Sequence, residues 1–201
     1  MFNWVTADGY FAAPDGNLDW VVPDQAQAKR AAEEISRFDT VLFGRRTYEI
    51  FEAFWPHAVV DGNGTVADPH FPERRSRETG VIAIALNKMM KLVFSKTLKD
   101  VTWGNSRLLR ELDPREIEAL KRQSGKDMII FGSGSIVSQL TQHGLIDEYE
   151  FVVCPILLGK GQLLLSGVTN RLGLDLSEVK GLPSGDVMLR YICAPNQVVG
   201  G

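Results

Sequence analysis

The residues with the clearest chemical potential follow an apolar run near position 40. The segment Leu42–Tyr48 reads Leu-Phe-Gly-Arg-Arg-Thr-Tyr, with two adjacent arginines directly after Gly44. The run Thr40–Phe43 is typical of the end of a buried strand, and a helix is expected to begin at Thr47. Backbone N–H groups at a helix N-terminus and guanidinium groups favour the same ligand charge. This junction is a candidate phosphate site; the alternative is a plain strand-turn-helix junction with solvated arginines.

Two further strand ends carry small and polar residues. Phe131-Gly132-Ser133-Gly134-Ser135 follows one predicted strand, and Ser95-Lys96-Thr97 follows another. Ligands of open α/β sheets bind at the carboxyl ends of parallel strands. A lone Gly-x-Gly is a weak signal, and no acidic ribose-binding residue follows about 20 positions on, which disfavours an ordinary Rossmann fold. The second segment could also be a simple turn with a solvated lysine. Together, the three strand ends predict a ligand with several phosphates.

The chain as a whole alternates predicted strands and helices. The expected strands are Phe2–Thr6, Thr40–Phe43, Leu92–Phe94, Val101–Trp103, Met128–Phe131, Glu148–Cys154, Leu172–Lys180 and Val187–Cys193. The expected helices are Pro23–Arg37, Arg46–Phe54, Gly80–Lys91, Pro114–Gln123 and Ile136–His143, although the apolar pattern of Gly80–Lys91 also fits a strand. Ala7–Asp19 is expected as a turn-rich loop, and His57–Gly80 as a functional flap or a mobile surface loop. This order predicts an α/β fold with a largely parallel sheet, finished by antiparallel strands.

Composition narrows the class of protein. The chain has 201 residues, 44% of them hydrophobic, and a net charge of −3. We expect one domain over residues 1–195, followed by a tail at 196–201. The negative net charge argues against nucleic acid or an anionic membrane as a partner. The sequence shows no candidate membrane-spanning segment or export signal, so we expect a cytoplasmic protein. Cys154 and Cys193 are expected to be reduced, and the scattered histidines predict no metal site.

Six short motifs occur in order along nearly the whole chain. They are Ala7-Asp8-Gly9, Gly16-Asn17-Leu18-Asp19-Trp20, Gly44-Arg45-Arg46-Thr47-Tyr48-Glu49, Val93-Phe94-Ser95-Lys96-Thr97-Leu98, Phe131-Gly132-Ser133-Gly134 and Pro155-Ile156-Leu157-Leu158-Gly159-Lys160-Gly161. In this order they resemble the dihydrofolate reductase-like fold, and within it the reductase (RibD C-terminal) domain of riboflavin biosynthesis and its stand-alone bacterial relatives. The resemblance implies three layers, with helices on both faces of a mostly parallel central sheet and antiparallel C-terminal strands. It also implies a homodimer.

The resemblance further implies NADPH as hydride donor. Under it, Arg45 and Arg46 lie near the adenosine 2′-phosphate, and Ser95 with Lys96 lies beside the adenosine end. Ala7 meets the nicotinamide through its backbone, and the loop from Asp8 to Trp20 closes over the ring. The implied cofactor-binding set is Ala7, Gly44, Arg45, Arg46, Thr47, Ser95, Lys96, Gly132, Ser133, Gly134, Ser135, Leu157 and Gly159, with Thr47 and the four residues of the Gly132 turn at the pyrophosphate.

The substrate side is marked by fewer residues. Asp8, Trp20, Tyr48, Phe51 and Trp55 are candidates, the four aromatic ones as walls of a pocket for a flat heterocycle, although helical spacing of aromatics is more typical of a core. Folate reductases carry a carboxylate on the first helix that helps protonate the pterin, and Asp24 is the one candidate in that region. The alternative for Asp24 is a carboxylate that stabilises the helix N-terminus. Tyr10 stands where the riboflavin enzyme often has a basic residue.

Three hypotheses on function follow. The first is an NADPH-dependent reductase that transfers hydride to a pterin-like or pyrimidine-like heterocycle. The second is the 5-amino-6-(5-phosphoribosylamino)uracil reductase of riboflavin biosynthesis, which the departure at Tyr10 weakens. The third is a catalytically silent NADP-binding module, since a fold does not determine an activity.

Overall fold

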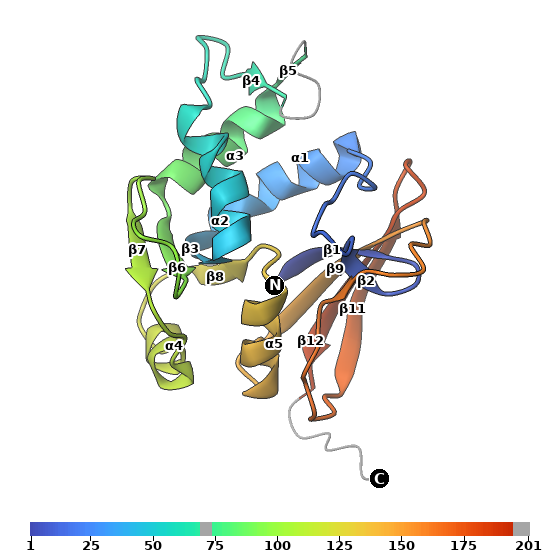
Figure 1. Ribbon diagram of the computed structural model, residues 1–201. Coiled ribbons are helices and arrows are strands. Elements are labelled where there is room, and N and C mark those ends of the chain that lie inside the picture. Colours follow the sequence, from blue (N-terminus) through green and yellow to red (C-terminus); the bar gives the residue numbers. More distant parts are fainter. Residues whose placement is uncertain (69–73, 195–201) are drawn as a thin grey trace. The chain divides into compact units, whose positions relative to one another are not determined.

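The computed structural model describes residues 1–68 and 74–194 of the chain (Figure 1). These residues form two compact units. The first unit comprises Met1–Val22, Asp113–Leu120 and the described residues from Ile130 onward, and the second comprises Lys121–Ile129 and the described residues of Pro23–Leu112. The expectation of one domain over residues 1–195 stays a prediction. The tail expected at residues 196–201 lies outside the described residues.

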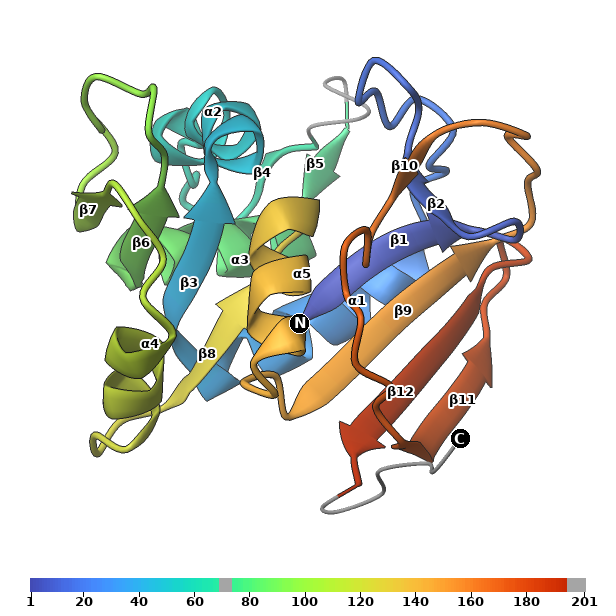
Figure 2. The same ribbon diagram turned by 60° about the horizontal axis from the view of Figure 1, so that its bottom comes forward.

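The second unit is built on a parallel sheet with the strand order β7-β6-β3-β8. Its strands are β3 (Phe38–Gly44), β6 (Met90–Phe94), β7 (Ser106–Leu109) and β8 (Asp127–Ile130). Gly44 at the end of β3 lies opposite Phe94 of β6, which in turn lies opposite Leu109 of β7. The arrows of β3 and β6 point the same way (Figure 2). The C-terminal ends of these two strands therefore meet at one edge of the sheet, as the alternating pattern predicts.

Helices of the second unit begin at recognisable caps. They are α1 (Gln25–Glu34), α2 (Arg45–Glu52) and α3 (Arg77–Lys88), with single turns η1 (Ile35–Arg37) and η2 (Trp55–His57). α1 and α3 pack side by side (Figure 1). The Ser76 hydroxyl accepts the N–H of Thr79 at 3.0 Å and caps α3. The helix expected over Gly80–Lys91 is therefore confirmed, although it begins and ends three residues earlier, and Lys91 lies in β6.

The first unit contains a mixed sheet with the strand order β1-β9-β12-β11. Its strands are β1 (Phe2–Thr6), β9 (Glu148–Cys154), β11 (Leu174–Gly181) and β12 (Val187–Cys193), and its helices are α5 (Gly134–Gln142) and most of α4 (Pro114–Lys121). β1 and β9 are parallel, whereas β9, β12 and β11 pair antiparallel. The Tyr149 hydroxyl donates to Thr141 Oγ1 at 2.9 Å and joins β9 to α5. The predicted α/β class, with mostly parallel strands and antiparallel C-terminal strands, is confirmed.

The prediction of a strand over Val101–Trp103 is wrong. The backbone N–H groups of Thr102 and Trp103 donate to the Tyr48 hydroxyl and to Glu52 instead of to a strand. The chain then turns at Asn105, whose φ is 60°, and the strand beside β6 is β7. A short apolar run was therefore mistaken for a strand, because its hydrogen-bond partners lie on a distant helix.

Short paired strands interrupt both predicted loops. Within Ala7–Asp19, β2 (Tyr10–Ala12) pairs with β10 (Gln162–Leu163). Within His57–Gly80, β4 (Val66–Ala67) pairs with β5 (Arg75–Ser76), and α3 begins directly after β5. Residues 69–73 of this segment lie outside the described residues. Over residues 1–68 and 74–194, none of the helices combines the length and apolar character that crossing a membrane requires.

Candidate functional site

A cationic junction forms where β3 runs into α2. Gly44 is the N-cap residue, so α2 begins at Arg45, one residue before the predicted helix Arg46–Phe54 and two before Thr47. Arg45 Nη1 donates to the Thr97 hydroxyl at 2.8 Å, and Arg45 Nε lies 3.1 Å from the Glu49 carboxylate. Arg45 and Arg46 are both exposed. The junction therefore presents two guanidinium groups at a helix N-terminus, where the backbone dipole also favours an anion.

The turn after β6 lies beside this junction. Its Ser95 hydroxyl accepts the backbone N–H groups of Thr97 and Leu98, at 3.3 and 2.9 Å. Arg110 donates from Nη1 to the carbonyl oxygens of Ser95 and Leu98. The turn is thus closed on itself and tied to the start of α2 through Thr97. The structure brings together the predicted cofactor residues of the second unit, which are Gly44, Arg45, Arg46, Thr47, Ser95 and Lys96.

Asp8 organises the loops at the C-terminal ends of β1 and β9 in the first unit. Its carboxylate accepts the Thr6 hydroxyl at 2.6 Å and the N–H groups of Leu158 and Gly159 at 3.2 and 2.7 Å. The hydrogen bond from Thr6, and those from Gly159 and Leu158, lower the pKa of Asp8 below its usual range. The adjacent Ala7 N–H donates to the carbonyl of Ile156 at 3.0 Å. The structure therefore places Ala7 and Asp8 against the loop that carries Leu157 and Gly159.

The turn before α5 has an unusual backbone. Gly132 and Ser133 have φ values of 56° and 58°, and Ser133 is one of two non-glycine residues with positive φ among the described residues. Such a conformation costs roughly 1–3 kcal/mol and is concentrated at functional sites. A Cβ at Gly134 would lie 2.7 Å from Cζ of Phe11, so the ring of Phe11 packs directly on the turn. This turn belongs to the first unit, and its expected convergence with the turns at Gly44 and Ser95 stays a prediction.

Comparison with known proteins identifies the family. The family model of the RibD C-terminal domain matches residues 1–188. The chain belongs to the RibD C-terminal domain family.

Several proteins are similar to this RibD C-terminal domain in sequence or in fold. The chain is 24% identical over 187 residues to the uncharacterized protein YyaP of Bacillus subtilis, covering 93% of this chain and 90% of that protein. It is similar, at 21% identity and a TM-score of 0.69, to the crystal structure of a putative riboflavin biosynthesis protein from Shewanella, covering 96% and 97% of the two chains. A deaminase/5-amino-6-(5-phosphoribosylamino)uracil reductase from Thermotoga maritima matches at 14% identity and a TM-score of 0.61, over 96% of this chain and 55% of that one.

The aromatic candidates separate into core and half-buried residues. In this RibD C-terminal domain Tyr48 is fully buried, with its ring against Phe43 and Trp103. Trp20 is 8% exposed and packs among Val152, Cys154 and Met188. Tyr48 and Trp20 therefore pack in the core, and their role in a substrate pocket stays a prediction. Phe51 and Trp55 are half-buried, and their substrate role stays a prediction.

Asp24 caps the first helix. Its Oδ1 accepts the N–H groups of Ala26 and Gln27, at 2.7 and 3.0 Å, and its side chain is largely buried. Asp24 therefore has the alternative role given above, that of a carboxylate which stabilises the helix N-terminus. The role of Asp24 as a candidate catalytic residue stays a prediction.

Replacing Asp24 by asparagine is expected to have a small effect. Asparagine caps helices about as well as aspartate, so the Asp24→Asn variant should lose at most about 0.5–1 kcal/mol of unfolding free energy. If Asp24 is not an indispensable acid, hydride transfer should stay within about tenfold of the parent, which corresponds to about 1.4 kcal/mol. Urea unfolding and the rate of NADPH oxidation measure the two effects. A thousandfold loss of turnover with intact NADPH binding would identify Asp24 as the proton donor.

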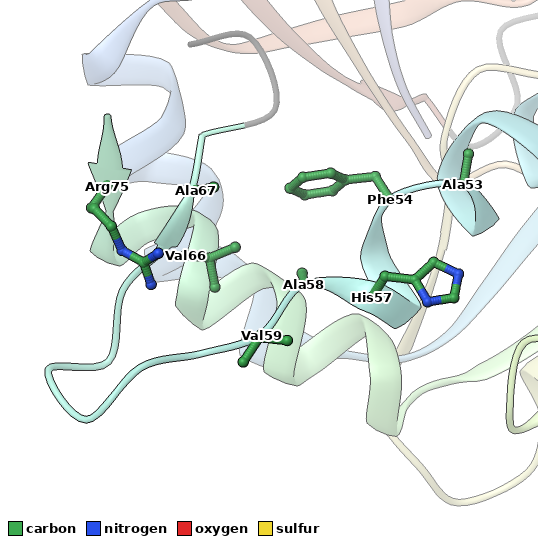
Figure 3. Close-up of a pocket in the computed structure, with 8 residues that line it drawn as sticks. All are labelled: Ala53, Phe54, His57, Ala58, Val59, Val66, Ala67 and Arg75. Carbon is green, nitrogen blue, oxygen red and sulfur yellow. The ribbon is translucent and has the colours of Figure 1, made fainter. Parts of the chain in front are cut away.

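A separate cavity of about 280 Å³ lies at the C-terminal end of α2 (Figure 3). It is lined by Ala53, Phe54, His57, Ala58, Val59, Val66, Ala67 and Arg75. Arg75 is already bound to Asp61 at 3.0 Å and donates to the hydroxyl and carbonyl of Thr65. The cavity is slightly smaller than the usual range for ligand pockets. None of the predicted site residues lines it.

The cysteines are free thiols. Cys154 is buried, and burial raises its pKa to about 12, so the thiol stays protonated and poorly nucleophilic. Cys193 donates to the carbonyl of Ile146 at 3.1 Å. Over the described part of the chain, no group of three or more His, Cys, Asp or Glu side chains is arranged to hold a metal ion.

Proposed function

We propose that this protein is an NADPH-dependent reductase that transfers hydride to a pterin-like or pyrimidine-like heterocycle. The observation that carries the proposal is the junction of β3 and α2, where Arg45 and Arg46 stand beside the Ser95–Thr97 turn. Paired guanidinium groups and hydroxyls at a helix N-terminus suit the 2′-phosphate that distinguishes NADPH from NADH. Membership of the RibD C-terminal domain family supports the same activity.

The residues of the chain would bind and orient the cofactor in this proposal. Arg45, Arg46, Ser95 and Lys96 hold the adenosine phosphate, and the contacts of Thr47 and of the turn of Gly132 to Ser135 with the pyrophosphate stay predictions. When bound, NADPH supplies the hydride, and the protein supplies position and exclusion of water. Ala7 contacts the nicotinamide through its backbone. Asp8, which accepts hydrogen bonds from two backbone N–H groups and the Thr6 hydroxyl, is the proposed contact to the substrate.

The second candidate is the riboflavin-pathway reductase itself. Two observations support it. The chain has the Asp8-Gly9 motif, and the name of the similar Thermotoga protein includes a reductase whose uracil substrate carries a phosphoribosyl group. Tyr10 weighs against it, since a neutral residue there offers no charge to a substrate phosphate.

A direct experiment tests both candidates. Fluorescence titration with NADPH and NADH measures cofactor binding, and NADPH oxidation is then followed with pterins, pyrimidines and the ribosylamino-pyrimidine. Turnover of the ribosylamino-pyrimidine alone would favour the riboflavin reductase. Tight NADPH binding without turnover of any ring substrate would favour a catalytically silent module, and no NADPH binding at all would contradict the proposal.

The protein is also proposed to form a homodimer through the apolar face of β11 and β12. The register places Leu176 and Val179 opposite Tyr191 and Leu189 on one face, and Leu176 and Val179 are 55% and 59% exposed. An edge strand with exposed apolar side chains is commonly covered by a twofold-related copy. Light scattering at micromolar concentration should give a dimer mass.

Matched variants locate this interface. Val179→Lys should give a folded monomer, because it introduces a charge that the partner would bury. Asp175→Lys, at another exposed position on the opposite face of β11, should leave the dimer intact. A monomeric mass for the parent protein would contradict the proposed homodimer.

A further inference from the structure

The segment Ser95–Asn105, called the strap below, connects β6 to β7 and carries the proposed phosphate-binding residues. Its first part holds Ser95, Lys96 and Thr97. The strap has no strand of its own to hold it in place. Its position therefore depends on individual hydrogen bonds to neighbouring elements.

α2 contacts the strap at both ends of the helix. At the first residue of α2, Arg45 donates to the Thr97 hydroxyl at 2.8 Å. At the last residue, one oxygen of the Glu52 carboxylate accepts the backbone N–H groups of Thr102 and Trp103, each at 3.2 Å, and also the Thr102 hydroxyl. The strap is thus fixed to one rigid helix at two points, near its beginning and near its end.

Tyr48 reinforces the second contact from inside the core. Its hydroxyl donates to Glu52 at 2.7 Å and lies 3.1 Å from the same two N–H groups, those of Thr102 and Trp103. Trp103 is held further, because its indole N–H donates to Asn87 Oδ1 at 2.6 Å. Removing the Glu52 carboxylate leaves the Thr102 hydroxyl and the phenol without their acceptor, so the strap gains freedom to move.

We propose that Glu52 is a positioning residue that holds the strap along α2, so that Ser95, Lys96 and Thr97 stay beside Arg45 and Arg46 to receive the adenosine phosphate of NADPH. The inference rests on the proposed NADPH-dependent function. Glu52 does not itself contact the cofactor and acts only through the strap. Its effect is therefore greatest for the cofactor that carries the 2′-phosphate.

Three variants test this role. In Glu52→Ala the anchor is lost, and NADPH affinity should fall about tenfold while NADH affinity falls less than about threefold. In Glu52→Gln the amide oxygen can still accept the same hydrogen bonds, so affinity for both cofactors should stay within about threefold of the parent. Asp39→Ala is the matched control, since Asp39 also holds a loop by accepting a backbone N–H, that of Lys126 at 2.8 Å, but at the opposite end of β3. It should leave the NADPH-to-NADH ratio unchanged.

Hydrogen exchange of the strap amides, without cofactor, gives an independent readout. The amides of Thr97 to Trp103 should exchange faster in Glu52→Ala than in the parent and in Glu52→Gln. Unchanged exchange, equal weakening of both cofactors, or the same selective loss in Asp39→Ala would each overturn the role of Glu52. A parent protein that binds no NADPH would instead overturn the proposed function, and the cofactor role of Glu52 with it.

Discussion

Replacing Arg46 by alanine is expected to weaken NADPH binding about ten- to a hundredfold and to leave NADH binding nearly unchanged. A hydrogen bond to a charged group contributes roughly 1.5–3 kcal/mol, and the 2′-phosphate that Arg46 is proposed to contact is absent from NADH. Replacing Arg45 instead would also remove its contacts with Thr97 and Glu49. Fluorescence titration with both cofactors measures the effect.

A second arginine of the same unit provides the control. Arg37 lies near the N-terminal end of β3 and pairs with Glu34 and Asp127, so Arg37→Ala removes one positive charge away from the proposed site. Its NADPH affinity should match that of the parent protein. Comparable losses for NADPH and NADH in Arg46→Ala would contradict the assignment of Arg46 to the 2′-phosphate.

Replacing Lys91 by methionine is expected to cost about 2–4 kcal/mol of unfolding free energy. Lys91 is fully buried in β6, and its Nζ donates to the carbonyl oxygens of Asn87, Met89 and Gly104 at 3.3, 2.9 and 2.9 Å. It also lies 4.5 Å from the centre of the Trp103 ring, within range of a cation–π interaction. Methionine fills a similar volume but leaves three buried acceptors without a donor. Urea unfolding measures the loss.

The same residue predicts a dependence of stability on pH. Burial lowers the pKa of Lys91 to about 8 in the folded protein, whereas a lysine in the unfolded chain has a pKa near 10.4. Between these values the unfolded chain binds more protons at this residue, so the contribution of Lys91 to stability rises with pH. The difference in unfolding free energy between the parent and Lys91→Met should therefore grow by about 1–3 kcal/mol from neutral pH to about pH 10.

Lys88→Met provides the control for both measurements. Lys88 is exposed in the last turn of α3, and its replacement should change the unfolding free energy by less than about 0.5 kcal/mol. A difference between the parent and Lys91→Met that stays constant over this pH range would show that Lys91 keeps an ordinary pKa in the folded protein.

The sequence by itself determined most regular elements and the family. The strands Phe2–Thr6, Glu148–Cys154 and Val187–Cys193 have the predicted bounds, and Asp24 stands at the predicted helix start. These features depend on residues within a few positions of one another, through periodicity, caps and turns, and local sequence reports them directly. The six ordered motifs likewise pointed to the family, and the match over residues 1–188 confirms it.

Tertiary structure decided which side chains are buried and what they bind. Helical spacing left Tyr48 open between a pocket wall and the core, and only its contact with Trp103, 55 positions away, makes it a core residue. Tyr48 and Glu52 are four residues apart, a spacing that allows a side-chain contact on one helix face. The hydrogen bond from Thr102 to Glu52 could not be predicted from this spacing. Lys91 was predicted as the last residue of a helix, and only the structure places it in β6, where it is buried. Hydrogen bonds between distant segments depend on how the chain folds back, and local propensity carries no information about them.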